Sequence, residues 1–247
     1  MECGIIGLGG LSDLAYDSGE NEMVWDRKSY IRFYDNIHCH YYNLLIKYCF
    51  LPFLGEKKVR RELIAPVDFL PKDRILDMGC GTGGATFAIA ERAGEKAEIV
   101  GIDLSSGQIG IARKNNRFGN LTFLIGDAAA TSFVEGCFDK VFIAHAIHEM
   151  TREMRLQVLR EAKRTLKGGG KVVVLELDSP KNFFVRLFIA LWFGYWLPFN
   201  FETPTRRDML KHGVANEVEE AGFRNIRKIS EFRSNYRGVF QVVEGEK

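Results

Sequence analysis

The sequence predicts an α/β protein with a doubly wound, mostly parallel sheet. From residue 74 onward, short apolar runs alternate with segments of helical length and periodicity, as expected when each strand is followed by a helix. A glycine-rich turn directly after the first run supports this, because ligands in such sheets bind beyond the carboxyl ends of the strands. The predicted strands are 74–78, 98–103, 121–125, 138–144 and 171–177, and the predicted helices between them are 84–93, 106–117 and 152–166.

Two segments precede this alternating part. Residues 1–21 are rich in glycine, serine and acidic residues and lack the features of a signal peptide, so we expect a mobile leader. Residues 22–64 carry aromatic and aliphatic side chains at helical spacing between Tyr30 and Tyr48, which predicts an N-terminal helical cap. We expect residues 65–247 to form the main domain.

Residues 75–84 (ILDMGCGTGG) predict a buried strand that runs into a glycine-rich turn, with a helix behind it. The first N–H groups of that helix can bind a ligand. The glycines fit both the dinucleotide pattern G-x-G-x-x-G and the pattern D-x-G-x-G-x-G. Asp77 favours the second, since a carboxylate there would repel a pyrophosphate but can pair with the ammonium group of S-adenosylmethionine.

Two further acids follow the next strands. Asp103 ends the second predicted strand, where its carboxylate can accept hydrogen bonds from both hydroxyls of a ribose, a feature shared with NAD sites. Asp127 follows the third strand and is placed to reach an adenine amine. The alternative for each acid alone is a helix N-cap or a turn residue.

The chain is predicted to close with a helix and a strand pair. In helix 152–166, apolar residues form one stripe, and Gly168–Gly170 are expected to stop the helix. A last helix is predicted over 206–221, followed by strands at 223–230 and 236–243.

At these residues the chain resembles the Rossmann-like (class I) S-adenosylmethionine-dependent methyltransferases. The matching segments are 76–83, 101–105, 126–128 and 166–172, in the order and spacing of that family. The resemblance implies a seven-stranded sheet with an antiparallel C-terminal strand, and S-adenosyl-L-methionine as cofactor with S-adenosyl-L-homocysteine as product. It also implies N-terminal helices that close over the cofactor through a pair such as Tyr34 and Asp35. We expect the cofactor site to comprise Tyr34, Asp77, Gly79, Cys80, Gly81, Gly83, Asp103, Leu104, Gln108, Gly126, Asp127, Ala128 and Ala144.

Candidate catalytic residues follow the fourth predicted strand. His145, His148 and Glu149 are the candidate general bases, and Glu176 after the fifth strand also falls beside the transferable methyl group. A histidine pKa near neutrality suits this role. The alternatives are histidines that only bond to loop backbone, or a His148-Glu149 pair that caps the next helix.

Within the family, the chain is most similar to the ubiquinone/menaquinone-biosynthesis methyltransferases. Segments 173–180, 201–205 and 221–223 carry this resemblance, together with a long hydrophobic insert, whereas residues 145–148 depart from that group's usual sequence. The insert, 180–204, is aromatic-rich between residues 183 and 201. We expect it to be a lid over the substrate pocket whose outer face rests on a membrane. A core helix is the alternative.

The amino-acid composition limits the kinds of partner and site that we expect. A net charge of +2 disfavours a dedicated nucleic-acid binder, and five scattered cysteines indicate reduced thiols in a cytoplasm and no metal site. We expect a methyltransferase for a lipophilic, quinone-like or lipid-like small molecule, with peripheral membrane contact and a homodimer left open. The alternatives are a phospholipid head group or a thiol as acceptor, or a non-catalytic S-adenosylmethionine-binding regulator.

Overall fold

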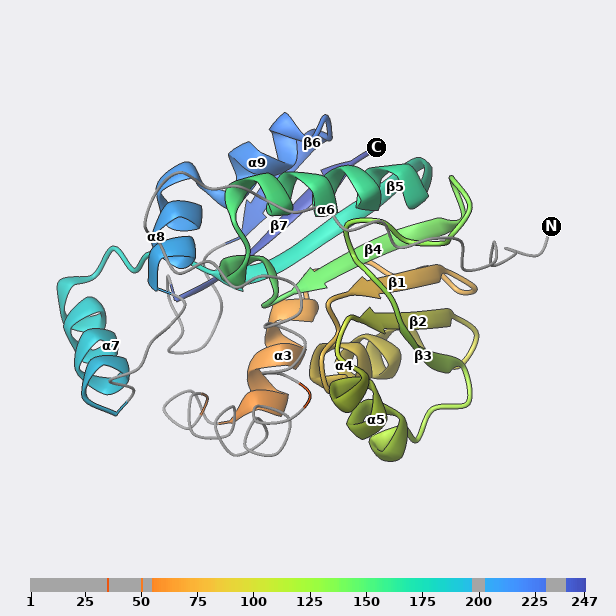
Figure 1. The fold of residues 1–247 in the computed structure, drawn as a ribbon, viewed down its shortest axis with the longest axis horizontal. Coiled ribbons are helices and arrows are strands. Elements are labelled where there is room, and N and C mark those ends of the chain that lie inside the picture. The colour runs from red at the N-terminus through yellow and green to blue at the C-terminus, as the bar shows by residue number, and fades with distance from the viewer. Residues whose placement is uncertain (1–34, 36–49, 51–54, 197–202, 230–238) are drawn as a thin grey trace.

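The fold is built on one sheet of seven strands in the order β3-β2-β1-β4-β5-β7-β6. It was analysed in a computed structural model, which describes residues 35, 50, 55–196, 203–229 and 239–247. Strands β1 to β5 are parallel, and β7 runs antiparallel to both β5 and β6, as predicted (Figure 1). The strands are β1 (Arg74–Met78), β2 (Glu98–Asp103), β3 (Leu121–Ile125), β4 (Phe138–Ala144), β5 (Leu166–Leu177), β6 (Arg224–Ile229) and β7 (Phe240–Glu246).

Helices cover both faces of this sheet, which makes it doubly wound. One face carries the helices drawn below the sheet in Figure 1, and the other carries those drawn above it. The first group is α3 (Glu56–Ile64), α4 (Gly84–Ala93) and α5 (Ser106–Asn115). The second group is α6 (Arg152–Thr165), α8 (Thr203–His212) and α9 (Val214–Glu220), and a short 3-10 turn, η3 (Ile147–Glu149), precedes α6.

Each face has its own hydrophobic core, because successive side chains of a strand point to opposite sides of the sheet. Val173 belongs to the core that includes residues of α3, α4 and α5, whereas its neighbours Val172 and Val174 belong to the core that includes residues of α6, α8 and α9. All three valines are fully buried. The near-continuous apolar runs of the sequence therefore reflect strands that are covered on both faces.

Two predicted boundaries are wrong. Helix α6 ends at Thr165, ahead of the glycines expected to stop it, and Gly168–Gly170 lie inside β5. Leu166 already has an extended backbone and pairs with Phe138 of β4, so strand pairing ends the helix. The single helix predicted over 206–221 is two helices, because Gly213 has a positive φ of 83° and interrupts the turn.

Smaller shifts affect other ends. Helix α5 stops at Asn115, two residues before its predicted end, because Asn116 has an extended backbone. The last strand, predicted over 236–243, extends to Glu246 and pairs with β5 from Phe240 onward. The predicted leader lies outside the described residues, as does most of the predicted cap, of which α3 is the described helix.

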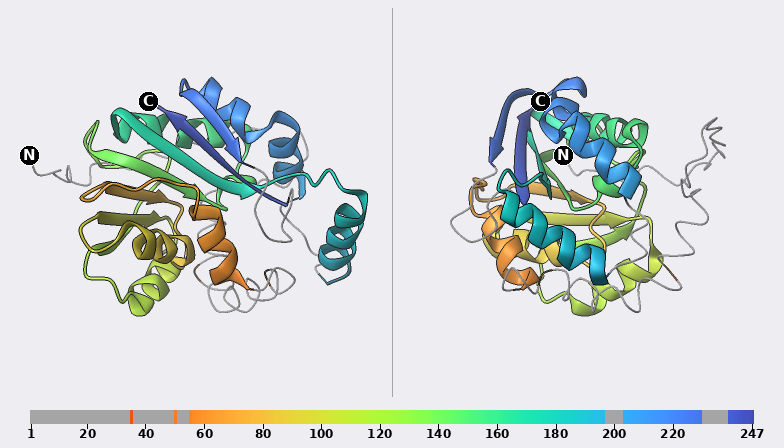
Figure 2. Two further views of the ribbon diagram at one scale, coloured as in Figure 1. Left: turned by 180° about the vertical axis from the view of Figure 1, so that it is seen from behind. Right: turned by 90° about the vertical axis from the view of Figure 1, so that its left-hand side faces the viewer.

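Helix α7 (Phe183–Trp196) covers part of the predicted insert. Figures 1 and 2 show that it lies beyond the carboxyl ends of β4 and β5. Most of the described side chains of its first turns are exposed, including Phe183, Phe184 and Leu191 at 68%, 76% and 62%, whereas Val185 is half-buried and packs against the core. Over this stretch the helix is therefore not a core helix. Among the described residues, no helix combines the length and apolarity that a membrane span requires.

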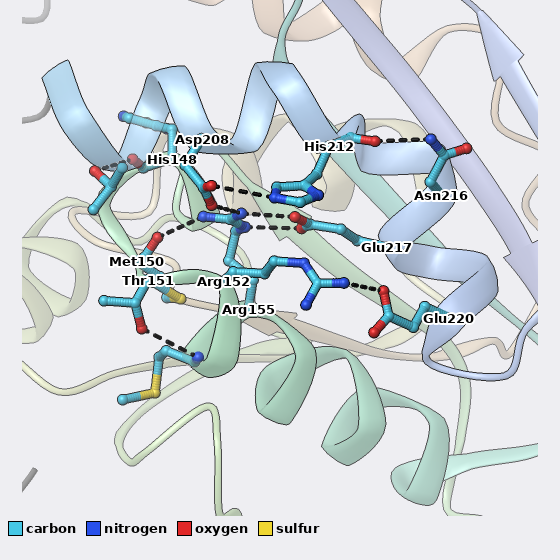
Figure 3. Close-up of polar contacts among 12 residues, drawn as sticks. His148, Met150, Thr151, Arg152, Arg155, Asp208, His212, Asn216, Glu217 and Glu220 are labelled. Carbon is cyan, nitrogen blue, oxygen red and sulfur yellow. Dashed lines mark hydrogen bonds and ion pairs between the residues drawn. The ribbon is translucent and has the colours of Figure 1, made fainter. Parts of the chain in front are cut away.

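A buried ion pair joins α6 to α9. The Arg155 guanidinium is fully buried and donates from Nε and Nη2 to the two oxygens of Glu217, at 2.8 and 2.6 Å (Figure 3). It also donates to the Met150 carbonyl oxygen at 2.8 Å and to Asp208 on α8 at 2.7 Å. Glu217 is also buried, and among the described residues Arg155 is the cation paired with it.

We expect Arg155→Met to lower the free energy of unfolding by about 3–5 kcal/mol, because Glu217 would keep a buried charge without its partner. The exposed pair Arg152–Glu220 joins the same two helices and is the matched control (Figure 3). Arg152→Ala should cost less than about 1 kcal/mol. Urea titration followed by circular dichroism measures both, and equal losses would contradict a special role for the buried pair.

Candidate functional site

The glycine loop connects β1 to α4 and lies against two neighbouring loops. Gly79 and Cys80 donate their N–H groups to the Ile102 carbonyl oxygen of β2, both at 2.9 Å. Gly79 has a positive φ of 71°, and a Cβ there would lie 2.9 Å from Cβ of Ala146 in the loop after β4. Only glycine allows this approach. The loop is thereby held beside the carboxyl ends of β2 and β4.

Asp103 ties the end of β2 to this loop. Its Oδ2 accepts from the Gly81 N–H at 2.8 Å, and its Oδ1 accepts from the Ser105 N–H at 2.9 Å. Burial raises the pKa of Asp103 above its ordinary value, and these hydrogen bonds oppose the rise. A carboxylate offers about four acceptor positions. It can therefore hold both backbone groups and still accept from the two hydroxyls of a ribose.

Asp77 is the least satisfied acid of the site. It is fully buried in β1, and its Oδ2 accepts from the Thr86 hydroxyl of α4 at 2.6 Å. Within the described part of the chain, its Oδ1 has no hydrogen-bond partner. Burial raises the pKa of Asp77 to about 7, even though Thr86 and Arg60 favour the ionised form. A buried acceptor without a donor fits a ligand that brings its own cationic donor, as the ammonium group of S-adenosylmethionine would.

The other predicted cofactor residues gather around the same edge. Asp127 accepts from the Ala129 N–H at 2.9 Å, which is the turn geometry considered as its alternative. Gln108 is buried in the first turn of α5, and its side-chain oxygen has no partner among the described residues. The remaining described members are Cys80, Gly83, Leu104, Gly126, Ala128 and Ala144, all on the loops or strand ends that form this edge. Tyr34 lies outside the described residues.

Asp35, the neighbour of Tyr34, caps α5. Its Oδ1 accepts from the Ser105 hydroxyl at 2.6 Å and from the Gly107 N–H at 3.0 Å. Burial raises the pKa of Asp35, but these hydrogen bonds outweigh it and lower the pKa overall. The carboxylate thus satisfies a helix N-terminus. Because Ser105 is two residues after Asp103 in the sequence, this contact holds Asp35 of the N-terminal segment near the cofactor site.

His148 forms the strongest polar contact in the loop after β4. Its Nδ1 lies 2.9 and 3.1 Å from the two carboxylate oxygens of Glu176 near the end of β5. Its carbonyl oxygen accepts from the Thr205 hydroxyl of α8 at 2.8 Å. Helix α6 is capped by Thr151, so the alternative in which His148 and Glu149 cap that helix is wrong. Glu149 ends η3 and is half-buried.

His145 has different surroundings. Its backbone has a positive φ of 53°, and its N–H donates to the Leu175 carbonyl oxygen at 2.8 Å. Its ring meets the rings of Phe50 and Phe240 edge-on, with centroids 6.0 and 5.6 Å away. Burial lowers the pKa of His145 and outweighs the opposing effect of Glu176, whose Oε1 is 3.9 Å from Nδ1.

Glu176, which the sequence placed beside the transferable methyl group without naming it as a base, contacts both histidines. Its side chain is fully buried, and its Oε1 also accepts from the Leu177 N–H at 2.8 Å. Burial alone would raise the pKa of Glu176, but His148 and His145 together bring it well below the usual range. The signal in the sequence is an acid that interrupts an apolar strand, because a buried acid requires a partner.

The comparisons with known proteins agree with this geometry. A family model described as a methyltransferase domain matches residues 75–170. An uncharacterised methyltransferase of Synechocystis is 30% identical over 174 residues, which cover 70% of this chain and 77% of that protein. A demethylmenaquinone methyltransferase of Bacillus velezensis is 34% identical over 152 residues, but these cover 60% of this chain and 64% of that protein, less than two thirds of its length.

The fold has solved relatives. The crystal structure of an S-adenosylmethionine-dependent methyltransferase from Thermotoga maritima matches 87% of this chain and 99% of its own, with a TM-score of 0.59 and 20% identity. At that identity the likeness concerns the fold, and its methyltransferase architecture is that of the sheet described above. The Synechocystis relative shows that the chain belongs to the S-adenosylmethionine-dependent methyltransferases with this Rossmann-like fold, and demethylmenaquinone methyltransferases are among the proteins to which it is similar.

Proposed function

We propose that this protein transfers a methyl group from S-adenosylmethionine to a lipophilic, quinone-like small molecule. The observation that carries the acceptor class is the exposed apolar surface of α7, which stands at the edge of the sheet where the cofactor residues gather (Figure 1). The similarity to demethylmenaquinone methyltransferases supports the same class.

The cofactor part of the proposal rests on three acids. Asp77 offers a buried oxygen to a cationic group, Asp103 offers acceptor positions to a ribose, and Asp127 lies in the turn after β3. The three are at the carboxyl ends of the adjacent strands β1, β2 and β3. When bound there, S-adenosylmethionine supplies an already activated methyl group, so the protein has to orient the acceptor and remove its proton.

The acceptor part rests on how the apolar residues of α7 are arranged. At about 100° per residue, the five exposed positions fall within an arc of about 140° on one side of the helix. Val185 lies outside that arc and packs against the core, so the helix is seated on the domain through another side. The five exposed residues are Phe183, Phe184, Leu187, Phe188 and Leu191, which we call the α7 stripe.

The α7 stripe also fits a peripheral contact with a membrane. Exposed apolar surface of this kind is uncommon on a soluble surface and typical of a ligand or membrane contact. Two basic residues, Lys181 and Arg186, lie at the start of the helix, where they can meet anionic head groups. A lipophilic acceptor dissolved in that membrane could then enter at the carboxyl edge of the sheet.

We expect Asp103→Ala to weaken S-adenosylmethionine binding at least tenfold, because each lost charge-assisted hydrogen bond to the ribose is worth roughly 1.5–3 kcal/mol. Isothermal calorimetry measures the affinity. Asp139→Asn is the control, since Asp139 is a hydrogen-bonded acid at the opposite, amino-terminal end of β4. Unchanged affinity in the first variant, or tight binding of NAD by the wild type, would overturn the cofactor assignment.

Cofactor binding should release a proton at slightly acidic pH. With a pKa of about 7, most Asp77 carboxyls are protonated at pH 6, and pairing with the ammonium group favours the ionised form. Affinity should therefore rise with pH up to about 7 and then level off. Calorimetry at pH 6 in buffers of different ionisation enthalpy counts the protons. Asp77→Asn should release clearly fewer, and equal release would show that Asp77 does not contact the cofactor.

The α7 stripe should control the use of a lipophilic acceptor. We expect Phe184→Ser with Leu191→Ser to reduce methylation of a prenylated demethylmenaquinol in vesicles at least tenfold, because two large apolar contacts are lost at roughly 1.5–3 kcal/mol each. S-adenosylmethionine affinity should not change. Leu70→Ser is the control, since Leu70 is equally exposed but precedes β1 at the other edge.

The same assay tests the acceptor class. Phosphoethanolamine and a small thiol serve as polar acceptors beside the demethylmenaquinol. Faster turnover of either polar acceptor by the wild type would replace the proposed acceptor. No turnover of any acceptor, with cofactor binding intact, would instead favour a regulator that binds S-adenosylmethionine without catalysis.

A further inference from the structure

We propose that Glu176 is a positioning residue that holds His148 as the general base of methyl transfer. This inference rests on the proposed function, and it distinguishes two candidates that the sequence leaves equivalent, His145 and His148. It depends on the geometry of two neighbouring strand ends, β4 and β5.

The position of His148 is set by the loop after β4. The loop that carries His148 contacts the cofactor loop directly, since Ala146 is the residue that a Cβ on Gly79 would meet. Register between β4 and β5 is continuous from the Lys140–Lys171 pair to the Ala144–Leu175 pair, so Glu176 is the next residue of β5 beyond the last position paired with β4. The base and its partner therefore sit at the strand ends where the methyl group of a bound cofactor is expected.

The contact with Glu176 determines the tautomer of His148. An ionised carboxylate accepts hydrogen bonds and donates none, so the close contact of Glu176 requires the proton of His148 to be on Nδ1. In that tautomer Nε2 is the nitrogen that takes up a proton. The Leu177 N–H donates to Oε1 of the same carboxylate at 2.8 Å and so helps to hold it in place. A buried acid that orients an imidazole in this manner also stabilises its protonated form.

The surroundings of His145 differ from those of His148. Nδ1 of His145 is 3.9 Å from Oε1 of Glu176, beyond hydrogen-bonding distance, and its ring is enclosed by Phe50 and Phe240. Burial lowers the pKa of His145, which disfavours uptake of a proton there.

The charges that face this unit come from several elements. Glu176 on β5 is the nearest, His145 follows β4, and Glu149 is on η3. Arg60 on α3 acts on His145 and on Asp77. Thr205 on α8 contributes a hydroxyl that holds the His148 backbone.

In the proposed reaction, His148 takes up the proton that the acceptor loses. The acceptor atom forms a bond to the methyl carbon and loses its proton to Nε2 of His148. The electron pair of the broken carbon–sulfur bond stays on sulfur, so the sulfonium becomes a neutral thioether. Glu176 remains ionised beside the imidazolium, which later returns the proton to water.

The coupling can be measured without any acceptor. In the wild type, nitrogen-15 NMR of the histidine rings should show His148 with its proton on Nδ1 at high pH. In Glu176→Gln the pKa of His148 should fall by at least about one unit, since the neutral amide no longer favours the imidazolium. His212, on α8 and paired with Asp208, is the control resonance and should not move. A wild-type His148 with its proton on Nε2 would overturn the proposal.

Turnover then tests the role in catalysis. With a short-tailed demethylmenaquinol, His148→Gln should lower kcat by about 10²–10⁴, and Glu176→Gln by about 10–100 with a shifted pH profile. S-adenosylmethionine affinity should be unchanged in both, and the double variant should be no slower than His148→Gln. Glu176→Asp keeps a carboxylate and should retain more activity than Glu176→Gln. It is the variant to measure if Glu176→Gln does not fold.

The outcomes are distinguishable from failure of the proposed function. A wild type that binds S-adenosylmethionine but does not methylate the quinol argues against the proposed acceptor, and the NMR result still decides whether Glu176 controls His148. Normal kcat and an unshifted pH profile in folded Glu176→Gln would remove Glu176 from the mechanism. Normal kcat in His148→Gln would remove His148 as well.

Discussion

The cost of burying carboxylates at the carboxyl edge of the sheet is the constraint on which the site depends. A carboxylate removed from water must find donors, or it becomes protonated. Asp103 finds the amides of Gly81 and Ser105, and Glu176 finds His148 and the Leu177 amide. The bonds of Asp103 join the loop after β1 to the end of β2, and those of Glu176 join the loop after β4 to the end of β5.

Asp77 departs from this pattern in an informative way. It has one hydroxyl donor for two oxygens, and its pKa is raised by burial. A fold selected for stability alone would supply a second donor or an apolar side chain. Leaving the position incomplete is understandable in a methyltransferase, because the cofactor brings the missing positive group and the protein keeps a prearranged acceptor for it.

Two kinds of surface meet at this edge. The cofactor side is polar and built from backbone amides and acids, whereas α7 presents an apolar stripe to solvent. The helix keeps its place through Val185, and Asn182 caps its first turn by accepting from the N–H groups of Phe184 and Val185. On the face of the sheet that α6, α8 and α9 cover, the Arg155–Glu217 pair joins α6 to α9. The apolar stripe is thus carried by an ordered helix, which suits a specific contact.

The sequence by itself determined the local features. Strand positions, the glycine loop and the acids that end β1 and β2 follow from periodicity and from residue types at fixed spacing, because such signals are contained in a few consecutive residues. The misplaced boundaries have a common cause. Gly168–Gly170 are helix breakers in isolation, but pairing with β4 recruits the preceding residues into β5, and that pairing is not local.

Only the tertiary structure decided which side chains act together. Glu176 and His148 are 28 residues apart, and Arg155 and Glu217 are 62 apart. Asp35 reaches Ser105 across 70 residues. Residue types suggested candidates at His145, His148 and Glu149, yet nothing in their spacing indicated which one faces a buried acid. That depends on the register of β4 against β5 and on the backbone of the loop between them, which form only when the sheet assembles.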